Sequence, residues 1–77
     1  GEESWKEDIR PIMARTVSCI PGSFIEEKDF SLVWHYRNAE QSSARIAEAE
    51  LLDTFVRLTA NLNLQVLKGH KALEVRR

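Results

Sequence analysis

The chain has 77 residues, of which 43% are hydrophobic and 30% are charged, and its formal net charge is −1. This composition is typical of a folded globular domain, although so small a domain buries only about 60% of the surface that its unfolded chain exposes. A net charge this close to zero provides no basic field to attract phosphate backbones or anionic lipids. We therefore expect neither nucleic acid nor a membrane as a partner.

Cys19 is the only cysteine, which excludes an internal disulfide and favours a reducing compartment. We expect it to be a small buried apolar residue rather than a reactive thiol. No stretch reaches the roughly 18 consecutive apolar residues of a membrane span, and the opening GEESWKED lacks the basic region and apolar core of a signal peptide. These features lead us to expect a cytoplasmic protein.

Apolar residues at helical spacing predict a first helix from Trp5 to Ser18. Pro11 lies inside this segment and lacks a backbone donor, so we expect either a kink or a helix that starts later. The run Ile20-Pro21-Gly22-Ser23 is a typical stop signal, because proline cannot continue the helix and glycine accepts positive φ.

From Ser23 onward the apolar period changes to two, and residues 23–28 and 31–37 predict two strands around a turn at Asp29-Phe30. Opposite residues of an antiparallel pair share a face, and side chains alternate along each strand. This turn predicts that Lys28 faces Ser31, Glu26 faces Val33 and Phe24 faces His35, and it therefore separates a charged set from an apolar set. The charged set is Glu26, Lys28, His35 and Arg37, and the apolar set is Ile25, Leu32, Trp34 and Tyr36.

The segment from Glu40 to Ala60 is predicted to be a second amphipathic helix that ends with Asn61 in a left-handed conformation. Its charged residues, including Glu48, are expected to lie away from the buried stripe. The predicted stripe consists of Ala44, Ala47, Leu51, Phe55, Leu58 and Leu62.

Two further strands are predicted at residues 64–67 and 71–76, joined by a turn at Gly69-His70. Alternation along this hairpin directs one set of side chains toward the helices and the other set outward. The inward set is Leu64, Val66, Leu73 and Val75, and the outward set is Gln65, Leu67, Ala72 and Glu74.

The element order α-β-β-α-β-β predicts an α+β fold, a two-layer sandwich with a four-stranded antiparallel sheet and two helices on one face. The opposite face of the sheet is then uncovered and carries the charged side chains. The predicted core is Trp34, Tyr36, Leu51, Phe55, Leu64, Val66, Leu73 and Val75.

Exposed charges of this kind are more often a solvated surface than a binding site. His35 and His70, taken with the scattered carboxylates, show no metal-ligand spacing. The sequence also lacks a nucleophile elbow, a glycine-rich phosphate loop and a paired-cysteine motif. We therefore expect no catalytic residues and no bound cofactor within this chain.

The runs PGSFIEEKDFSLVWHYRNAE and KGHKALEVRR resemble the cap region of trehalose-6-phosphate phosphatases, which belong to the haloacid dehalogenase superfamily. The shared pattern has Pro-Gly before the first strand, Glu-x-Lys within it, and His-Tyr-Arg at the end of the next strand. It closes with Gly-x-Lys-x-x-Glu-Val-Arg in the last hairpin. The resemblance extends from about Trp5 to Arg76.

This resemblance implies that residues 1–77 are one substrate-specificity cap domain of a larger enzyme, which hydrolyses trehalose 6-phosphate to trehalose and phosphate. The implied partners are the enzyme's own Rossmann-like catalytic domain, which binds magnesium, and trehalose 6-phosphate itself. An alternative is a non-catalytic regulatory or interaction domain of a trehalose-phosphate synthase-like protein.

The same resemblance implies which side chains contact the sugar. Relatives often carry lysine or arginine where this chain has His70, so a cationic contact there would either be weakened or move to Lys71. The implied substrate-binding residues are Glu26, Lys28, Arg37 and Glu74, with His35, His70 and Lys71 as further candidates.

Overall fold

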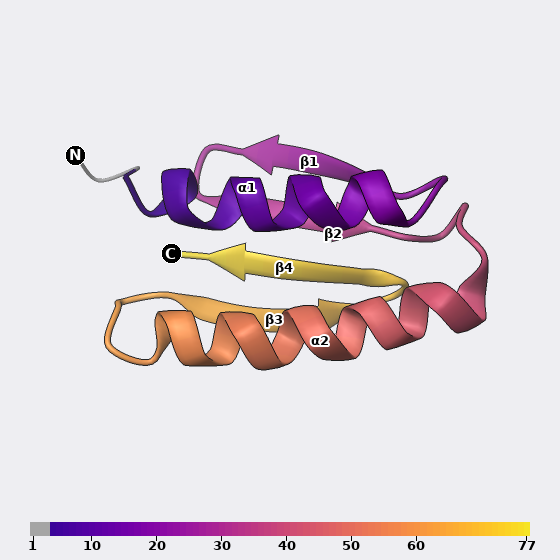
Figure 1. Ribbon diagram of the computed structural model, residues 1–77. Coiled ribbons are helices and arrows are strands. Elements are labelled where there is room, and N and C mark those ends of the chain that lie inside the picture. The colour runs from indigo at the N-terminus through magenta and orange to yellow at the C-terminus, as the bar shows by residue number, and fades with distance from the viewer. Residues whose placement is uncertain (1–3) are drawn as a thin grey trace.

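The computed structural model describes residues 4–77, which form two helices and four strands in the predicted order (Figure 1). The helices are α1 (Ser4–Cys19) and α2 (Gln41–Thr59). The strands are β1 (Phe24–Lys28), β2 (Ser31–His35), β3 (Gln65–Gly69) and β4 (Ala72–Arg76). Each hairpin therefore follows one helix along the chain.

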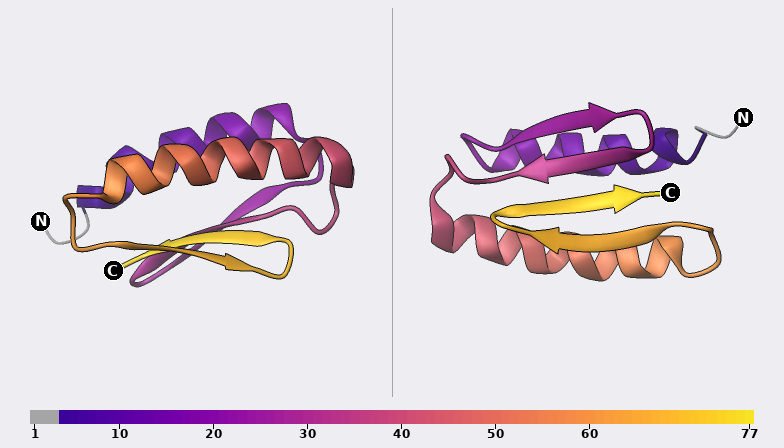
Figure 2. Two further views of the ribbon diagram at one scale, coloured as in Figure 1. Left: turned by 90° about the horizontal axis from the view of Figure 1, so that it is seen from below. Right: turned by 180° about the vertical axis from the view of Figure 1, so that it is seen from behind.

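The four strands form one antiparallel sheet in the order β1-β2-β4-β3. Figure 2 shows both helices in a single layer against one face of this sheet, while the other face is left uncovered. The predicted α+β two-layer sandwich is confirmed. Helix α1 lies against β1 and the central strand β2, and helix α2 lies against β3 and the central strand β4.

The core lies between the two layers and is built from the predicted inward positions together with α1. Six of the predicted core residues are buried, but Leu64 and Val66 are only partly buried. Leu64 precedes β3 and Val66 lies within it. Because β3 lies at the edge of the sheet, β4 shields it from solvent on one side. The buried apolar residues of this core are Trp5, Ile9, Met13, Leu32, Trp34, Tyr36, Ala44, Leu51, Phe55, Leu73 and Val75. Val33 and Ala72 are also buried, but they lie on the uncovered side of the sheet.

Helix α1 runs without interruption through Pro11, so the alternative of a later helix start is wrong. The helix ends where predicted, and Gly22 takes a φ of 91° in the turn that follows. The expectation of a buried Cys19 is also wrong, because this residue is exposed at the end of α1.

The register of the first hairpin is confirmed. Lys28 pairs with Ser31, Glu26 with Val33, and Phe24 with His35. The charged side chains therefore share the uncovered face of the sheet, as the two-residue turn predicted.

The buried stripe of α2 differs from the predicted stripe at two leucines and one glutamate. Leu58 and Leu62 are exposed, and Glu48 is buried instead. Glu48 is tolerated there because the Tyr36 hydroxyl donates a hydrogen bond to its carboxylate at 2.8 Å, and the Lys68 ammonium lies 3.9 Å away. Burial, together with this hydrogen bond, raises the pKa of Tyr36 above its ordinary value of 10.0.

The predicted left-handed ending of α2 at Asn61 is wrong. Ala60 caps the helix in a right-handed conformation, and Lys71 is the one non-glycine residue among residues 4–77 with positive φ. A tight turn follows the helix instead, because the Leu62 N–H donates a hydrogen bond to the Thr59 carbonyl three residues earlier at 3.0 Å.

The turn of the second hairpin lies at His70-Lys71, one residue beyond the predicted Gly69-His70. Lys71 adopts a φ of 54°, and its carbonyl accepts a hydrogen bond from the Tyr36 N–H at 2.9 Å. This bond to the neighbouring strand helps to hold the turn at the later position. Pairing shifts by two residues as a result, so every side chain keeps its predicted face, and Leu67 lies opposite Glu74.

The N-terminus of α2 is capped by the carboxylate of Glu40, which accepts hydrogen bonds from the backbone N–H groups of Ser42 at 3.0 Å and Ser43 at 2.9 Å. The hydrogen bonds from the side chain and backbone of Ser43, and then those from Ser42, lower the pKa of Glu40 to about 2. The charge also lies at the positive end of the helix dipole.

We predict that Glu40→Gln reduces the acid sensitivity of the fold. Because the folded-state pKa of about 2 lies below the ordinary value of 4.5, ionised Glu40 stabilises the fold above pH 4.5, and this contribution is lost as the pH falls toward 2. The melting temperature of the variant should therefore fall less than that of the parent between about pH 6 and about pH 2.5. Glu50→Gln on the exposed side of α2 is the control, and an equal loss in all three proteins would contradict the prediction.

Among the described residues, neither helix is both long enough and apolar enough to cross a membrane.

Candidate functional site

The uncovered face of the sheet brings together charged side chains from both hairpins. Val33 on β2 lies opposite Glu26 on β1 and also opposite Glu74 on β4, so the two carboxylates flank one apolar side chain. Lys28 follows two residues after Glu26 on the same face, and Arg37 lies just beyond β2. These residues line one hollow of about 490 Å³, whose floor includes Val33 and Ala72.

One ion pair and one hydrogen bond cross this face. The Lys28 ammonium lies 3.8 Å from the Glu74 carboxylate, and the Glu26 carboxylate lies 2.8 Å from Nε2 of His35. The Lys28 and Glu26 side chains are about half exposed. Exposed pairs of this kind contribute only about 0 to 1 kcal/mol, so a ligand that offers hydroxyl groups can replace them at little cost.

A second, smaller hollow adjoins the first at the end of the sheet where β1 begins, and it is lined by Phe24, Glu26, His35, Arg37 and Asn38. The Phe24 ring stacks on the His35 ring with centroids 4.9 Å apart, yet Phe24 remains 47% exposed. Sequence reasoning placed Phe24 opposite His35 but did not select it as a site residue. Asn38 was also missed, because it lies in a loop where no periodicity orients side chains.

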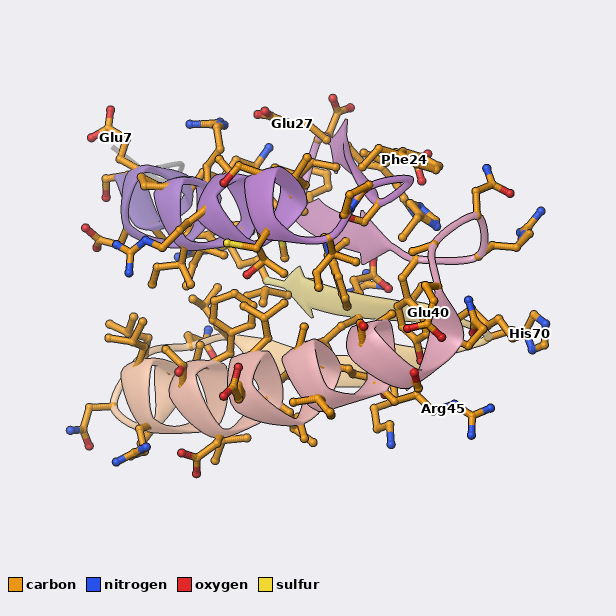
Figure 3. All side chains as sticks on the ribbon, turned by 45° about the vertical axis from the view of Figure 1, so that its right-hand side comes forward. Glu7, Phe24, Glu27, Glu40, Arg45 and His70 are labelled. Atoms are coloured by element: carbon orange, nitrogen blue, oxygen red, sulfur yellow. The ribbon has the colours of Figure 1, made fainter. Side chains whose placement is uncertain are left out.

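The three further candidates lie in different places. His35 and His70 both line the hollow of about 490 Å³ on the uncovered face. Lys71 lines a separate hollow beside α2 together with Arg45 and Glu48, and His70 borders that hollow as well. Figure 3 shows His70 and Arg45 at the same end of the molecule. Lys71 therefore lies apart from the charged residues of the uncovered face.

The arrangement suits recognition of a ligand with many hydroxyl groups. Carboxylates accept hydrogen bonds, lysine and arginine donate them, and the apolar floor can meet the carbon framework of a ligand. Within residues 4–77, no group of three or more histidine, cysteine, aspartate or glutamate side chains is placed to hold a metal ion.

Comparison with known proteins identifies the family. The family model described as trehalose-phosphatase matches residues 2–77. This chain belongs to the trehalose-phosphatase family. The resemblance read from the Pro-Gly, Glu-x-Lys, His-Tyr-Arg and Gly-x-Lys-x-x-Glu-Val-Arg motifs is thereby confirmed.

Relatives in this family are similar over nearly the whole chain. A bifunctional trehalose-6-phosphate synthase/phosphatase of Thermoproteus tenax is 40% identical over 97% of this chain and 10% of its own length. A trehalose-phosphatase of Zygosaccharomyces rouxii is 37% identical over 95% of this chain and 8% of its own length. The chain thus spans about a tenth of these curated relatives.

A solved structure of the trehalose-6-phosphate phosphatase from Aspergillus fumigatus aligns with 99% of this chain and 28% of the solved chain. The TM-score is 0.92 at 27% sequence identity. The two-layer fold described above is therefore a unit that occurs within a larger phosphatase of the same family.

Proposed function

We propose that this chain is the substrate-recognition cap of a trehalose-6-phosphate phosphatase, and that its uncovered sheet face binds the sugar of trehalose 6-phosphate. The observation that carries the proposal is the row across β1, β2 and β4, in which Glu26 and Glu74 flank Val33 beside Lys28 and Arg37 in one hollow. Family membership and the likeness to the Aspergillus phosphatase support the same role.

The charges of this face match the chemistry of a disaccharide. Each sugar hydroxyl both donates and accepts a hydrogen bond, so the Glu26 and Glu74 carboxylates accept from its O–H while Lys28 and Arg37 donate to its oxygen. Each hydrogen bond to a charged group contributes about 1.5 to 3 kcal/mol. Four such groups on one face are enough to orient a disaccharide.

The apolar groups of the face complement these polar contacts. Val33 is buried at the floor of the hollow, and the exposed Phe24 ring forms one wall of the adjoining hollow. Ligand pockets typically combine such apolar lining with a few convergent polar groups. We therefore place the C–H faces of the sugar against Val33 and Phe24.

Phosphate hydrolysis belongs, in this proposal, to a separate catalytic domain of the same enzyme. That Rossmann-like domain would supply the nucleophile and would hold the magnesium ion, whose charge would offset that of the phosphate. The cap contributes orientation and closure, because binding energy far from the scissile bond can position the reacting phosphate.

The test compares two substrates in a full-length phosphatase that carries this chain as its cap. Glu26→Ala, Lys28→Ala, Arg37→Ala and Glu74→Ala, each made alone, should lower kcat/KM for trehalose 6-phosphate by roughly tenfold for each 1.4 kcal/mol of lost interaction. A small aryl phosphate makes none of these sugar contacts, so its hydrolysis should not change.

Glu50→Ala is the matched control, because it removes an exposed carboxylate from α2, on the covered side of the sheet. Unchanged turnover of trehalose 6-phosphate in the four variants would contradict the proposal. An equal loss for both substrates in well-folded variants would also contradict it. If the parent protein hydrolyses neither substrate and lacks an Asp-x-Asp motif upstream of the cap, the regulatory alternative is favoured.

A further inference from the structure

Lys6, in the first turn of α1, is a buried cation that contacts the end of β1. It is 2% exposed, and its ammonium lies 2.6 Å from the carbonyl oxygen of Lys28 and 3.2 Å from that of Asp29. The same ammonium lies 3.3 Å from the carboxylate of Glu27. A buried charge is costly unless it is hydrogen-bonded, and these three oxygens are its acceptors.

Lys6 contacts a hairpin turn whose backbone geometry is unfavourable for a two-residue hairpin. Tight two-residue hairpins favour turns with positive φ at one or both central residues, since these match the twist of the strands. Lys71 is the one non-glycine residue of the described chain with positive φ. Asp29 and Phe30 therefore both have negative φ. The lysine contacts from α1 therefore support a turn that lacks the preferred geometry.

The same helix also holds β1 from the side. Among residues 4–77, β1 is an edge strand and pairs with β2 alone. Arg10 donates to both carboxylate oxygens of Glu27 at 2.9 Å, and Glu27 lies beside α1 in Figure 3. Hydrogen bonds from Arg10, and then from Lys6, lower the pKa of Glu27.

Lys6 thus contacts the sheet from its covered face, whereas the Lys28 side chain lies on the uncovered face. The two residues meet at the backbone carbonyl of Lys28. The Lys28 carbonyl accepts from Lys6 on the helix side, while the Lys28 side chain extends over the uncovered face toward Glu74. We infer that Lys6 is a positioning residue, which fixes the end of β1 and thereby places the Lys28 ammonium for sugar binding. This inference rests on the proposed function of the uncovered face.

The experiment uses trehalose as the probe and records amide NMR spectra of the full chain. Lys6→Met keeps the apolar stem and removes the ammonium. Amide exchange in residues 28–31 should speed up by about tenfold or more, and the trehalose concentration needed to shift the Lys28 resonances should rise by a similar factor. Amides in α2 and β4 should keep their parental exchange rates.

Arg10→Met is the matched control, because Arg10 binds the same carboxylate without touching the turn. Its exchange rates in residues 28–31 and its trehalose response should stay within about twofold of the parent. If Arg10→Met and Lys6→Met behave alike, the effect comes from the Glu27 ion pairs, and the inference is wrong.

A rescue separates positioning from general stability. Replacing Asp29→Asn together with Phe30→Gly introduces the residues that favour a self-supporting hairpin turn. In the Lys6→Met background, this pair should restore slow exchange in residues 28–31 and the parental trehalose response. If Lys6→Met does not fold alone, the same rescued protein is measured, and failure of the rescue overturns the inference.

Two further results would count against the inference. Parental exchange and parental trehalose response in Lys6→Met would show that β1 needs no support from Lys6. Faster exchange in every strand, with no rescue by the new turn, would show that Lys6 acts through global stability. If the parent shows no trehalose-induced shifts, the proposed function fails, while exchange in residues 28–31 still decides whether Lys6 holds the turn.

Discussion

Phe55→Ala is expected to remove about 3 to 5 kcal/mol from the free energy of unfolding. Phe55 is fully buried on α2, and its ring lies in the core between the helices and the sheet. Truncation leaves a cavity that a close-packed interior fills only in part. Since a small domain has about 5 to 15 kcal/mol of total stability, this single change should consume a large share of it.

Urea unfolding followed by circular dichroism measures this effect. Val56→Ala is the control, because Val56 is the next residue of α2 but is exposed, and its truncation should change the free energy by no more than about 0.5 kcal/mol. A Phe55→Ala protein with the parental unfolding midpoint would contradict the packing described here.

Gly22→Ala is expected to have the second large effect, on stability and on the neighbouring site. A Cβ atom at this position would lie 2.4 Å from the Asn38 carbonyl oxygen, and the residue has a φ of 91°. Positive φ in a non-glycine residue costs about 1 to 3 kcal/mol, and the backbone clash adds to that cost. The loop that carries Arg37 and Asn38 must then shift.

Gly69→Ala is the matched control for this change. A Cβ atom at Gly69 would lie 3.8 Å from that of Ala72, which is an ordinary van der Waals distance. Thermal unfolding should therefore distinguish the two variants, and the amide shifts of Arg37 and Asn38 should move only in Gly22→Ala. Equal melting temperatures for the two variants would contradict the close approach between Gly22 and the Asn38 carbonyl.

Local sequence pattern was sufficient to predict much of the candidate site. The alternation of apolar and charged residues around Asp29-Phe30 predicted the register of the first hairpin, and the structure confirms it. The second hairpin turn was predicted one residue too early, yet Glu74 stayed on the uncovered face. A shift of two residues in pairing preserves the face of every side chain, because the period of a strand is two.

Prediction failed where one side chain depends on a partner distant in sequence. Glu48 was expected outside the buried stripe of α2, but the Tyr36 hydroxyl and the Lys68 ammonium make its burial tolerable. Helical periodicity describes the average polarity of a helix face. It does not predict that a residue outside the helix supplies a polar partner. The exposed Leu58 and Leu62 reflect the same limit, because periodicity assigned them to the buried stripe whereas Thr59 is the residue that the fold buries in the last turn of α2.

By itself, the sequence determined the element order, the two faces of each hairpin and the residues that share the uncovered face. These features follow from local periods of 3.6 and 2.0 residues, which each segment carries independently of the rest. Only the tertiary structure decided that β4 lies beside β2, that Glu26 and Glu74 flank Val33, and that Lys6 supports the end of β1. Lys6 and Glu74 each contact residues more than twenty positions away in the sequence. Such contacts depend on how the packed layers bring separate elements together, and no local sequence pattern predicts them.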